Sequence, residues 1–113
     1  MRILFDQGVP KPLQAYLSLH VLSRAYQLGW AEKKNGELLA LAEGAGFELL
    51  VTTDQRMRYQ QNMAGRRVVV FVLGRGNWPE IIPYISQIVS TIEAIKGPGL
   101  YFSPIPPSEE RQP

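Results

Sequence analysis

The two aspartates of this 113-residue chain, Asp6 and Asp54, each follow a stretch that is typical of a buried strand, residues 2–5 and 47–53. A turn residue before Gly8 and a helix N-cap are the ordinary structural roles of such aspartates. The carboxyl ends of parallel strands lie at one edge of a sheet, so we expect both carboxylates to converge there.

Glu37 is the third carboxylate that we expect at this edge. It lies in the first turn of a predicted helix, where its charge complements the helix dipole, and that is its ordinary structural role. The spacing of four residues that relates Glu37 to Leu41 and Ala45 also predicts that Glu37 continues the buried stripe of the helix. We therefore expect its carboxylate to face inward, toward the same crevice as both aspartates.

Three carboxylates brought together repel one another unless a cation joins them. A site whose ligands are all oxygen atoms suits Mg²⁺ or Mn²⁺. These ions keep several bound waters and use few protein carboxylates. Such an ion activates a water and stabilises the charge that develops on a phosphate during an in-line displacement. The remaining acidic residues are poorer candidates for metal ligands. Glu43 is the exception, because it could contact the site from outside the set of direct ligands.

Basic residues gather near the predicted carboxylate edge. Five of them flank the predicted acidic positions or follow the last buried strand: Lys33, Lys34, Arg56, Arg58 and Arg75. This arrangement suits a polyanion whose flanking phosphates meet Lys and Arg. Three aromatic residues near the same edge could stack on unpaired bases: Trp30, Tyr59 and Trp78. Taken singly, each of these residues is more often a solvated charge or a packing residue.

The composition of the chain excludes several kinds of catalytic and metal-binding site. The chain has no cysteine and one histidine, His20, which excludes thiol chemistry, cysteine-ligated metals and sites built from several imidazoles. The net charge is only +2 although the pI is near 9.1, because almost nothing titrates between neutrality and the Tyr and Lys range. The placement of the charges therefore matters more than their sum.

Strand-like and helix-like segments alternate along the chain, which is typical of an α/β fold. Strands are predicted at residues 2–5, 20–25, 47–53 and 67–73, with a short edge strand within 100–105. Helices are predicted after Pro12, over 37–45, after Asp54 and over 79–96, where Ile81, Ile82 and later isoleucines share one face. This order predicts a three-layer helix–sheet–helix sandwich around a parallel sheet of four or five strands.

A single domain is expected over residues 1–107, because a chain of about 100 residues closes around one core. Residues 108–113 are expected to form a disordered tail. No stretch approaches the roughly 20 apolar residues of a membrane span, and the first apolar run is too short for a signal peptide. We therefore expect a cytoplasmic protein without membrane contacts.

Four segments carry a family likeness: Leu4-Phe5-Asp6-Gln7 before Val9-Pro10, Asn35-Gly36-Glu37-Leu38-Leu39, Ala45-Gly46-Phe47 and Leu50-Val51-Thr52-Thr53-Asp54. In this order they resemble the compact PIN-like domains related to the VapC-type toxins of toxin–antitoxin pairs. The resemblance covers residues 1–73, and two further stretches, 62–67 and 76–79, are also similar to the small members of the family.

The resemblance implies a metal-dependent endoribonuclease that acts as the toxin of such a pair. It implies that Asp6, Glu37 and Asp54 are catalytic acidic ligands of Mg²⁺ or Mn²⁺, and that a hydroxyl of Thr52 or Thr53 lines the site. It also implies an RNA substrate, a small antitoxin protein as partner, and a homodimer.

The fuller PIN pattern has four acidic positions, and Gln7 or Asn35 could act as a neutral ligand in place of the fourth. The incomplete set leaves two other interpretations open. One is a PIN-like module that has lost catalysis and binds RNA or protein. The other is a phosphoacceptor receiver-like domain, since Asp54 ends a central strand, although Asp6-Gln7 lacks the paired acid of that fold and no suitable lysine is present.

Overall fold

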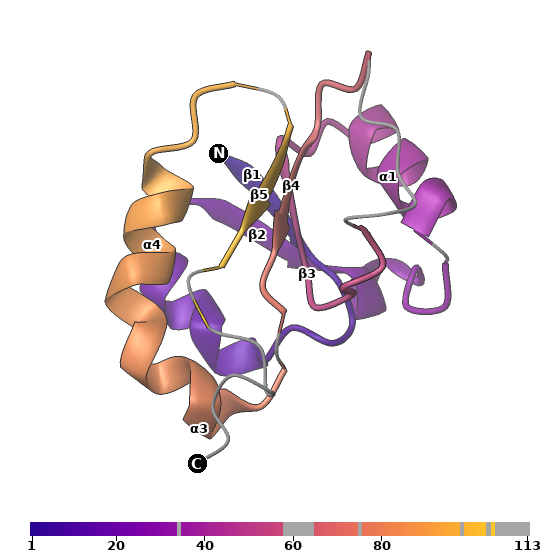
Figure 1. Cartoon of the computed structure of the whole chain (residues 1–113). Helices are drawn as coiled ribbons and strands as arrows, with labels where there is room; N and C mark the ends of the chain where they lie inside the picture. Colours follow the sequence, from indigo (N-terminus) through magenta and orange to yellow (C-terminus); the bar gives the residue numbers. More distant parts are fainter. Residues whose placement is uncertain (34, 58–64, 75, 98, 104, 106–113) are drawn as a thin grey trace.

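The computed structural model describes residues 1–33, 35–57, 65–74, 76–97, 99–103 and 105. Five strands lie in these ranges: β1 (Arg2–Phe5), β2 (Val21–Arg24), β3 (Leu49–Thr52), β4 (Val69–Val72) and β5 (Leu100–Phe102). They form one sheet in the order β2-β1-β3-β4-β5, and every neighbouring pair is parallel (Figure 1). The predicted α/β fold with a parallel sheet is confirmed.

Helical segments cover both faces of the sheet (Figure 1). One face packs against α1 (Asn35–Gly44), and the other packs against η1 (Lys11–Leu17), α3 (Trp78–Ile81) and α4 (Ile85–Glu93). Two short 3-10 turns, η2 (Ala25–Leu28) and η3 (Ile82–Tyr84), also lie in the described ranges. None of the helices in these ranges is both long enough and apolar enough to cross a membrane.

Alternating side chains of the strands divide the core into two clusters. Ile3 and Phe5 of β1 pack with η1 and α4, whereas Leu4 packs with α1. Every residue of β3 and β4 is buried, as expected for strands that are covered on both faces. Register is strongly specified in such a sheet, because a slip of one residue would exchange the two sets of side chains.

The predicted helix over residues 79–96 is interrupted in the structure. α3 ends at Ile81, and α4 begins only at Ile85, after the 3-10 turn that contains Pro83. Proline has no N–H to donate, so a regular helical ladder cannot continue through it. The turn leaves Ile82 49% exposed, and the prediction that Ile82 joins the buried face is therefore wrong.

The buried face of α1 differs from the predicted stripe. Its buried side chains are Leu38, Leu39 and Ala42, whereas Leu41 is half-buried and Ala45 is exposed beyond the helix end. At about 100° per residue, Glu37 lies about 150° from the centre of this face. Glu37 is exposed, so the prediction that it faces inward is wrong.

Two predicted segments fall largely on residues that are not described. The helix expected after Asp54 is seen only at Met57, and its continuation through Tyr59 and Met63 lies outside the described residues. The same holds for the tail over residues 108–113.

Glu43 of α1 forms hydrogen bonds with the residues just before β4, at the amino edge of the sheet. Its carboxylate accepts the backbone N–H groups of Arg67 and Val68, at 2.5 and 3.3 Å, and the guanidinium of Arg66 at 3.2 Å. These bonds, with the Arg67 N–H as the largest cause, lower the pKa of Glu43 from its ordinary 4.5. Glu43 is therefore a structural acid at the edge of the sheet opposite Asp6 and Asp54. It does not make the predicted contact with the site at the carboxyl edge.

We expect Glu43→Gln to lower stability at neutral pH and to make stability less sensitive to acid. A carboxyl group with a lowered folded-state pKa contributes stability that is present above its unfolded pKa and is lost as pH falls through the folded value. The advantage of the wild type should therefore shrink as pH falls below about 4.5. Urea midpoints across this range measure the difference, and an equal loss of stability in both proteins would contradict the assignment.

Candidate functional site

Asp6 and Asp54 lie where the strand order of the sheet reverses. β1 has β2 on one side and β3 on the other, and this is the place at which a doubly wound sheet leaves a crevice for a ligand. Asp6 directly follows β1, and Asp54 comes two residues after the end of β3. The topology therefore brings both aspartates to the same edge.

A buried hydroxyl links the two aspartates. Thr52, the last residue of β3, is fully buried, and it is the one buried polar side chain in the described part of the chain. Its Oγ1 donates to Oδ2 of Asp6 at 2.8 Å and accepts the backbone N–H of Asp54 at 3.1 Å. The N–H of Asp6 also donates to the carbonyl of Val51 at 2.9 Å. The loops after β1 and β3 are thus held by one network.

Asp6 also organises its own turn. Its Oδ1 accepts the backbone N–H of Gln7 at 2.7 Å, and its carbonyl accepts the N–H of Val9 at 3.1 Å. Within the described residues, each carboxylate oxygen accepts one hydrogen bond, although each has two lone pairs. The half-buried carboxylate is therefore fixed in orientation and keeps capacity for a further partner.

The carboxylate of Asp54 is paired with Arg56. The guanidinium donates from Nε to Oδ1 at 3.0 Å and from Nη2 to Oδ2 at 2.9 Å, while the backbone N–H of Arg56 also donates to Oδ1 at 2.9 Å. The backbone contact closes a turn over residues 54–56, and the helix that Asp54 was predicted to cap lies largely outside the described residues. The guanidinium adds a positive charge directly on the acid.

Glycines allow the loops of this edge to approach one another closely. A Cβ on Gly76, after β4, would lie 2.8 Å from the carbonyl oxygen of Gly8, and a Cβ on Gly8 would overlap Oγ1 of Thr53. Nε2 of Gln55 donates to the carbonyl of Gly74 at 3.1 Å. Described residues of the loops after β1, β3 and β4 therefore pack against one another near the aspartates.

Glu37, the third predicted acidic ligand, is not part of the network that links the two aspartates. Glu37 is exposed in the first turn of α1, where it complements the helix dipole. Asn35 begins α1, Gln7 contributes its backbone N–H to Asp6, and Thr53 packs against Gly8. The ranges that the structure describes contain no group of three His, Cys, Asp or Glu side chains that could hold a metal ion.

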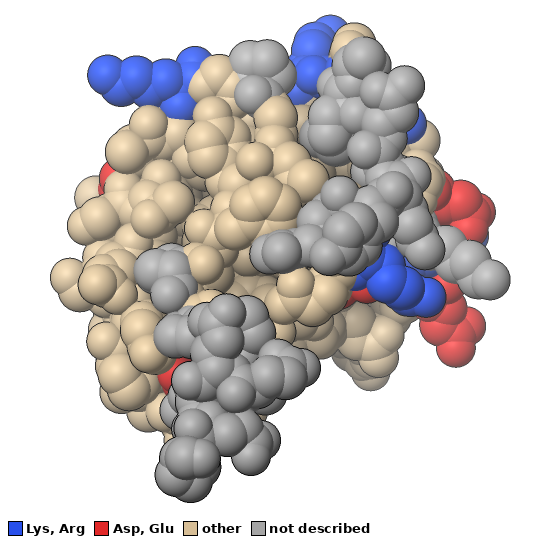
Figure 2. Space-filling model, viewed as in Figure 1, with Lys and Arg blue, Asp and Glu red and all other residues tan. Residues whose placement is uncertain are grey.

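The structure describes only some of the basic residues predicted at the carboxyl edge. Lys33 and Arg56 are exposed, and Lys34, Arg58 and Arg75 lie outside the described residues. Figure 2 shows Lys and Arg atoms along the upper rim of the molecule, at the end where the strands begin. Positive charge is therefore not confined to the carboxyl edge.

The predicted stacking residues and the single histidine have structural contacts. Trp30 lies edge-on to Phe47, with ring centroids 6.3 Å apart, and Trp78 packs against Tyr16 at 6.1 Å. Tyr59 lies outside the described residues. His20 is at the amino edge, where its Nε2 is 2.5 Å from Oε1 of Glu93. No imidazole is therefore available to the aspartates.

No family profile, curated protein or solved structure matches the chain at a significant level.

We expect Thr52→Val to lower the free energy of unfolding by about 1–3 kcal/mol, because the isosteric valine leaves Asp6 and the N–H of Asp54 without their buried partner. Thr52→Ser keeps the hydroxyl and should cost about 1 kcal/mol for the lost methyl group. Urea denaturation measures both. A valine variant as stable as the wild type would show that the hydroxyl does not hold the two loops together.

Gly76→Ala and Gly44→Ala should change thermal stability in opposite directions. The new Cβ at Gly76 would meet the backbone of Gly8 and force the loops apart. At Gly44, in the last turn of α1, a Cβ meets nothing within 4 Å, and alanine is favoured over glycine in a helix by up to about 1 kcal/mol. Equal melting temperatures for the two variants would argue against the close approach of the loops.

Proposed function

We propose that the chain is a metal-dependent endoribonuclease that hydrolyses RNA phosphodiester bonds with Mg²⁺ or Mn²⁺ at the carboxyl edge of its sheet. One observation carries the proposal. Asp6 and Asp54 stand at the reversal of strand order and are linked through the buried hydroxyl of Thr52. Glu37 remains in the proposal as an exposed acid in the first turn of α1, apart from this pair.

The donor atoms at this edge fit a small, hard cation. Mg²⁺ is commonly held by one or two carboxylates and keeps several waters, so a third acid is not required. Asp6 meets this need directly, because its oxygens are oriented by Gln7 and Thr52 and keep lone pairs. Asp54 supplies the second carboxylate when the ion replaces the Arg56 guanidinium on it.

The protein's own residues would bind and orient the substrate. When bound, the ion would supply an activated water and stabilise the charge that develops on the phosphate. Arg56 and Lys33, both exposed, would meet phosphates of the RNA backbone. Thr52 would keep the Asp6 carboxylate in one orientation throughout.

We further propose that the enzyme is the toxin of a toxin–antitoxin pair, acting in the cytoplasm as a homodimer that a small antitoxin protein binds. The support for this part is the resemblance of the four sequence segments to PIN-like domains. The two segments that contain Asp6 and Thr52-Thr53-Asp54 are the ones whose side chains meet at the carboxyl edge.

The pairing of Asp54 with Arg56 favours a second candidate function, a PIN-like module that binds RNA or protein without catalysis. In that case the acids would serve the fold, and the exposed cations would bind the partner. RNA binding that survives a double Asp6→Asn and Asp54→Asn substitution, with no cleavage by the wild type, would select this function.

Asp6→Asn should abolish Mn²⁺-dependent RNA cleavage and Mn²⁺ binding while the protein stays folded. The amide oxygen can still accept a hydrogen bond from Thr52 or Gln7, but the charge that attracts the cation is lost. Calorimetric titration with Mn²⁺ and cleavage of a labelled single-stranded RNA measure the two effects.

Glu48→Gln is the matched control for Asp6→Asn. Oε1 of Glu48 accepts the N–H of Arg2 at 2.9 Å, at the amino edge, and the same change of acid to amide there should leave cleavage intact. The nuclease proposal fails if the wild type neither binds Mn²⁺ nor cleaves RNA, or if Asp6→Asn cleaves as well as the wild type.

A further inference from the structure

Arg56 occupies the carboxylate that the proposed metal site needs. Both oxygens of Asp54 accept hydrogen bonds from the guanidinium, at 3.0 and 2.9 Å. The pair is charge-assisted and bidentate, which is the strong geometry for an arginine and a carboxylate. A divalent cation that binds Asp54 must therefore compete with a cation that belongs to the chain itself.

The backbone that carries Arg56 is fixed at several points. The N–H of Met57 donates to the carbonyl of Asp54 at 3.2 Å, and the Met57 side chain is fully buried in the cluster beneath α1. Gln55 is tied to Gly74 in the loop after β4. The turn that presents Arg56 therefore does not have to move when its side chain does.

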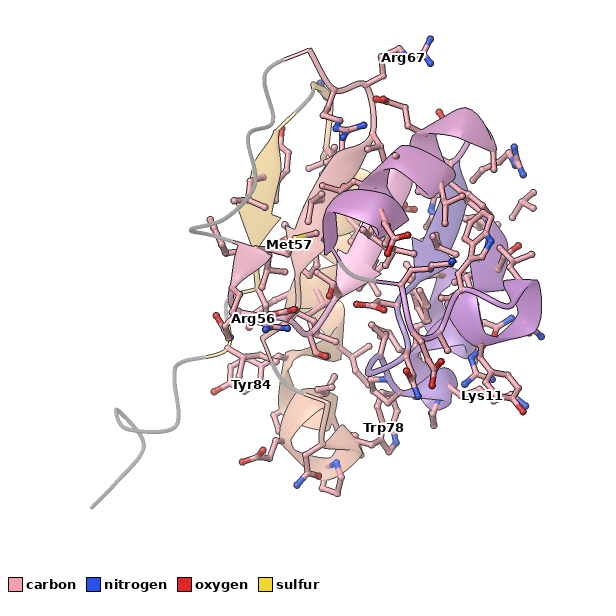
Figure 3. The ribbon with its side chains drawn as sticks, turned by 90° about the vertical axis from the view of Figure 1, so that its right-hand side faces the viewer. Lys11, Arg56, Met57, Arg67, Trp78 and Tyr84 are labelled. Atoms are coloured by element: carbon pink, nitrogen blue, oxygen red, sulfur yellow. The ribbon has the colours of Figure 1, made fainter. Side chains whose placement is uncertain are left out.

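The Arg56 side chain, in contrast, is 72% exposed, while that of Asp54 is only 19% exposed. Figure 3 shows Arg56 beside Met57, toward the end of the sheet that also carries Lys11 and away from Arg67. Water can solvate the guanidinium as soon as it leaves the acid, and exposed ion pairs are individually weak. Asp54, with most of its surface covered, stays in place.

We propose that Arg56 and a divalent cation compete for the carboxylate of Asp54, and that the displaced guanidinium then binds a phosphate of the RNA. This inference rests on the proposed nuclease function and adds the step that prepares the site. The planar guanidinium matches phosphate oxygens as well as carboxylate oxygens, so Arg56 exchanges one bidentate partner for another. The apparent affinity for metal is lowered by the fraction of molecules in which Arg56 covers Asp54.

Mn²⁺ titration of the metal-free protein tests the competition without any need for turnover. We expect Arg56→Gln to bind Mn²⁺ about threefold to tenfold more tightly than the wild type, because a cation that competes for Asp54 is removed. Arg56→Lys should lie between them, since an ammonium group cannot make the bidentate contact. Lys11→Gln removes the same charge from an exposed residue at the same end and should change the affinity much less.

A double-substitution cycle shows whether the effect passes through Asp54. In an Asp54→Asn background, Arg56→Gln should no longer increase Mn²⁺ affinity, because no carboxylate remains to be released. Circular dichroism of each variant verifies that it is folded. A gain that persists in this background, or an equal gain in Lys11→Gln, would overturn the competition and indicate a general charge effect.

The remaining outcomes separate this inference from the nuclease proposal. If the wild type and Arg56→Gln bind Mn²⁺ equally, the competition is refuted and the metal site stands. If neither binds Mn²⁺, both are refuted. Binding by Arg56→Gln alone would support the competition in its strongest form.

Discussion

The hydrogen bond from Thr52 to Asp6 is the interaction on which the carboxyl edge of the sheet depends. A hydroxyl at the end of a fully covered strand has no access to water, so its donor and acceptor must both find partners in the protein. The hydroxyl donates a hydrogen bond to the carboxylate of Asp6, and its oxygen accepts one from the N–H of Asp54. Satisfying one buried group therefore sets the positions of both aspartates.

The acids of the described chain serve different purposes at the two edges. At the amino edge, Glu43 and Glu48 bond to backbone N–H groups that lie beside strand beginnings, and those contacts hold the ends of the sheet. At the carboxyl edge, Asp6 and Asp54 bond to turns but are also placed where strand order reverses. The fold can support the acids at both edges, but only the second pair lies at the reversal of strand order, where doubly wound sheets bind ligands.

The strands were the predictable part of the structure, because burial on both faces leaves nearly continuous apolar runs such as residues 67–73. The face of α1 was harder to predict. Leu38 and Leu39 are adjacent and both buried, so the spacing of four residues from Glu37 did not fix which side of the helix turns inward. The pairing of Arg56 with Asp54 depends on the turn between them, and hydrophobic periodicity carries no information about that turn.

A structural role for an aspartate does not compete with a role in binding metal. A cation binds best to a carboxylate that is already ionised and held in one orientation, because little ordering then remains to oppose binding. Thr52 and Gln7 provide that order for Asp6, and Arg56 provides it for Asp54. The difference is that the hydrogen-bond donors to Asp6 are neutral and can stay, whereas the guanidinium that binds the Asp54 carboxylate is a cation. In the proposed competition, the asymmetry between these two acids makes Arg56, rather than either aspartate, the residue that would determine how readily a metal binds.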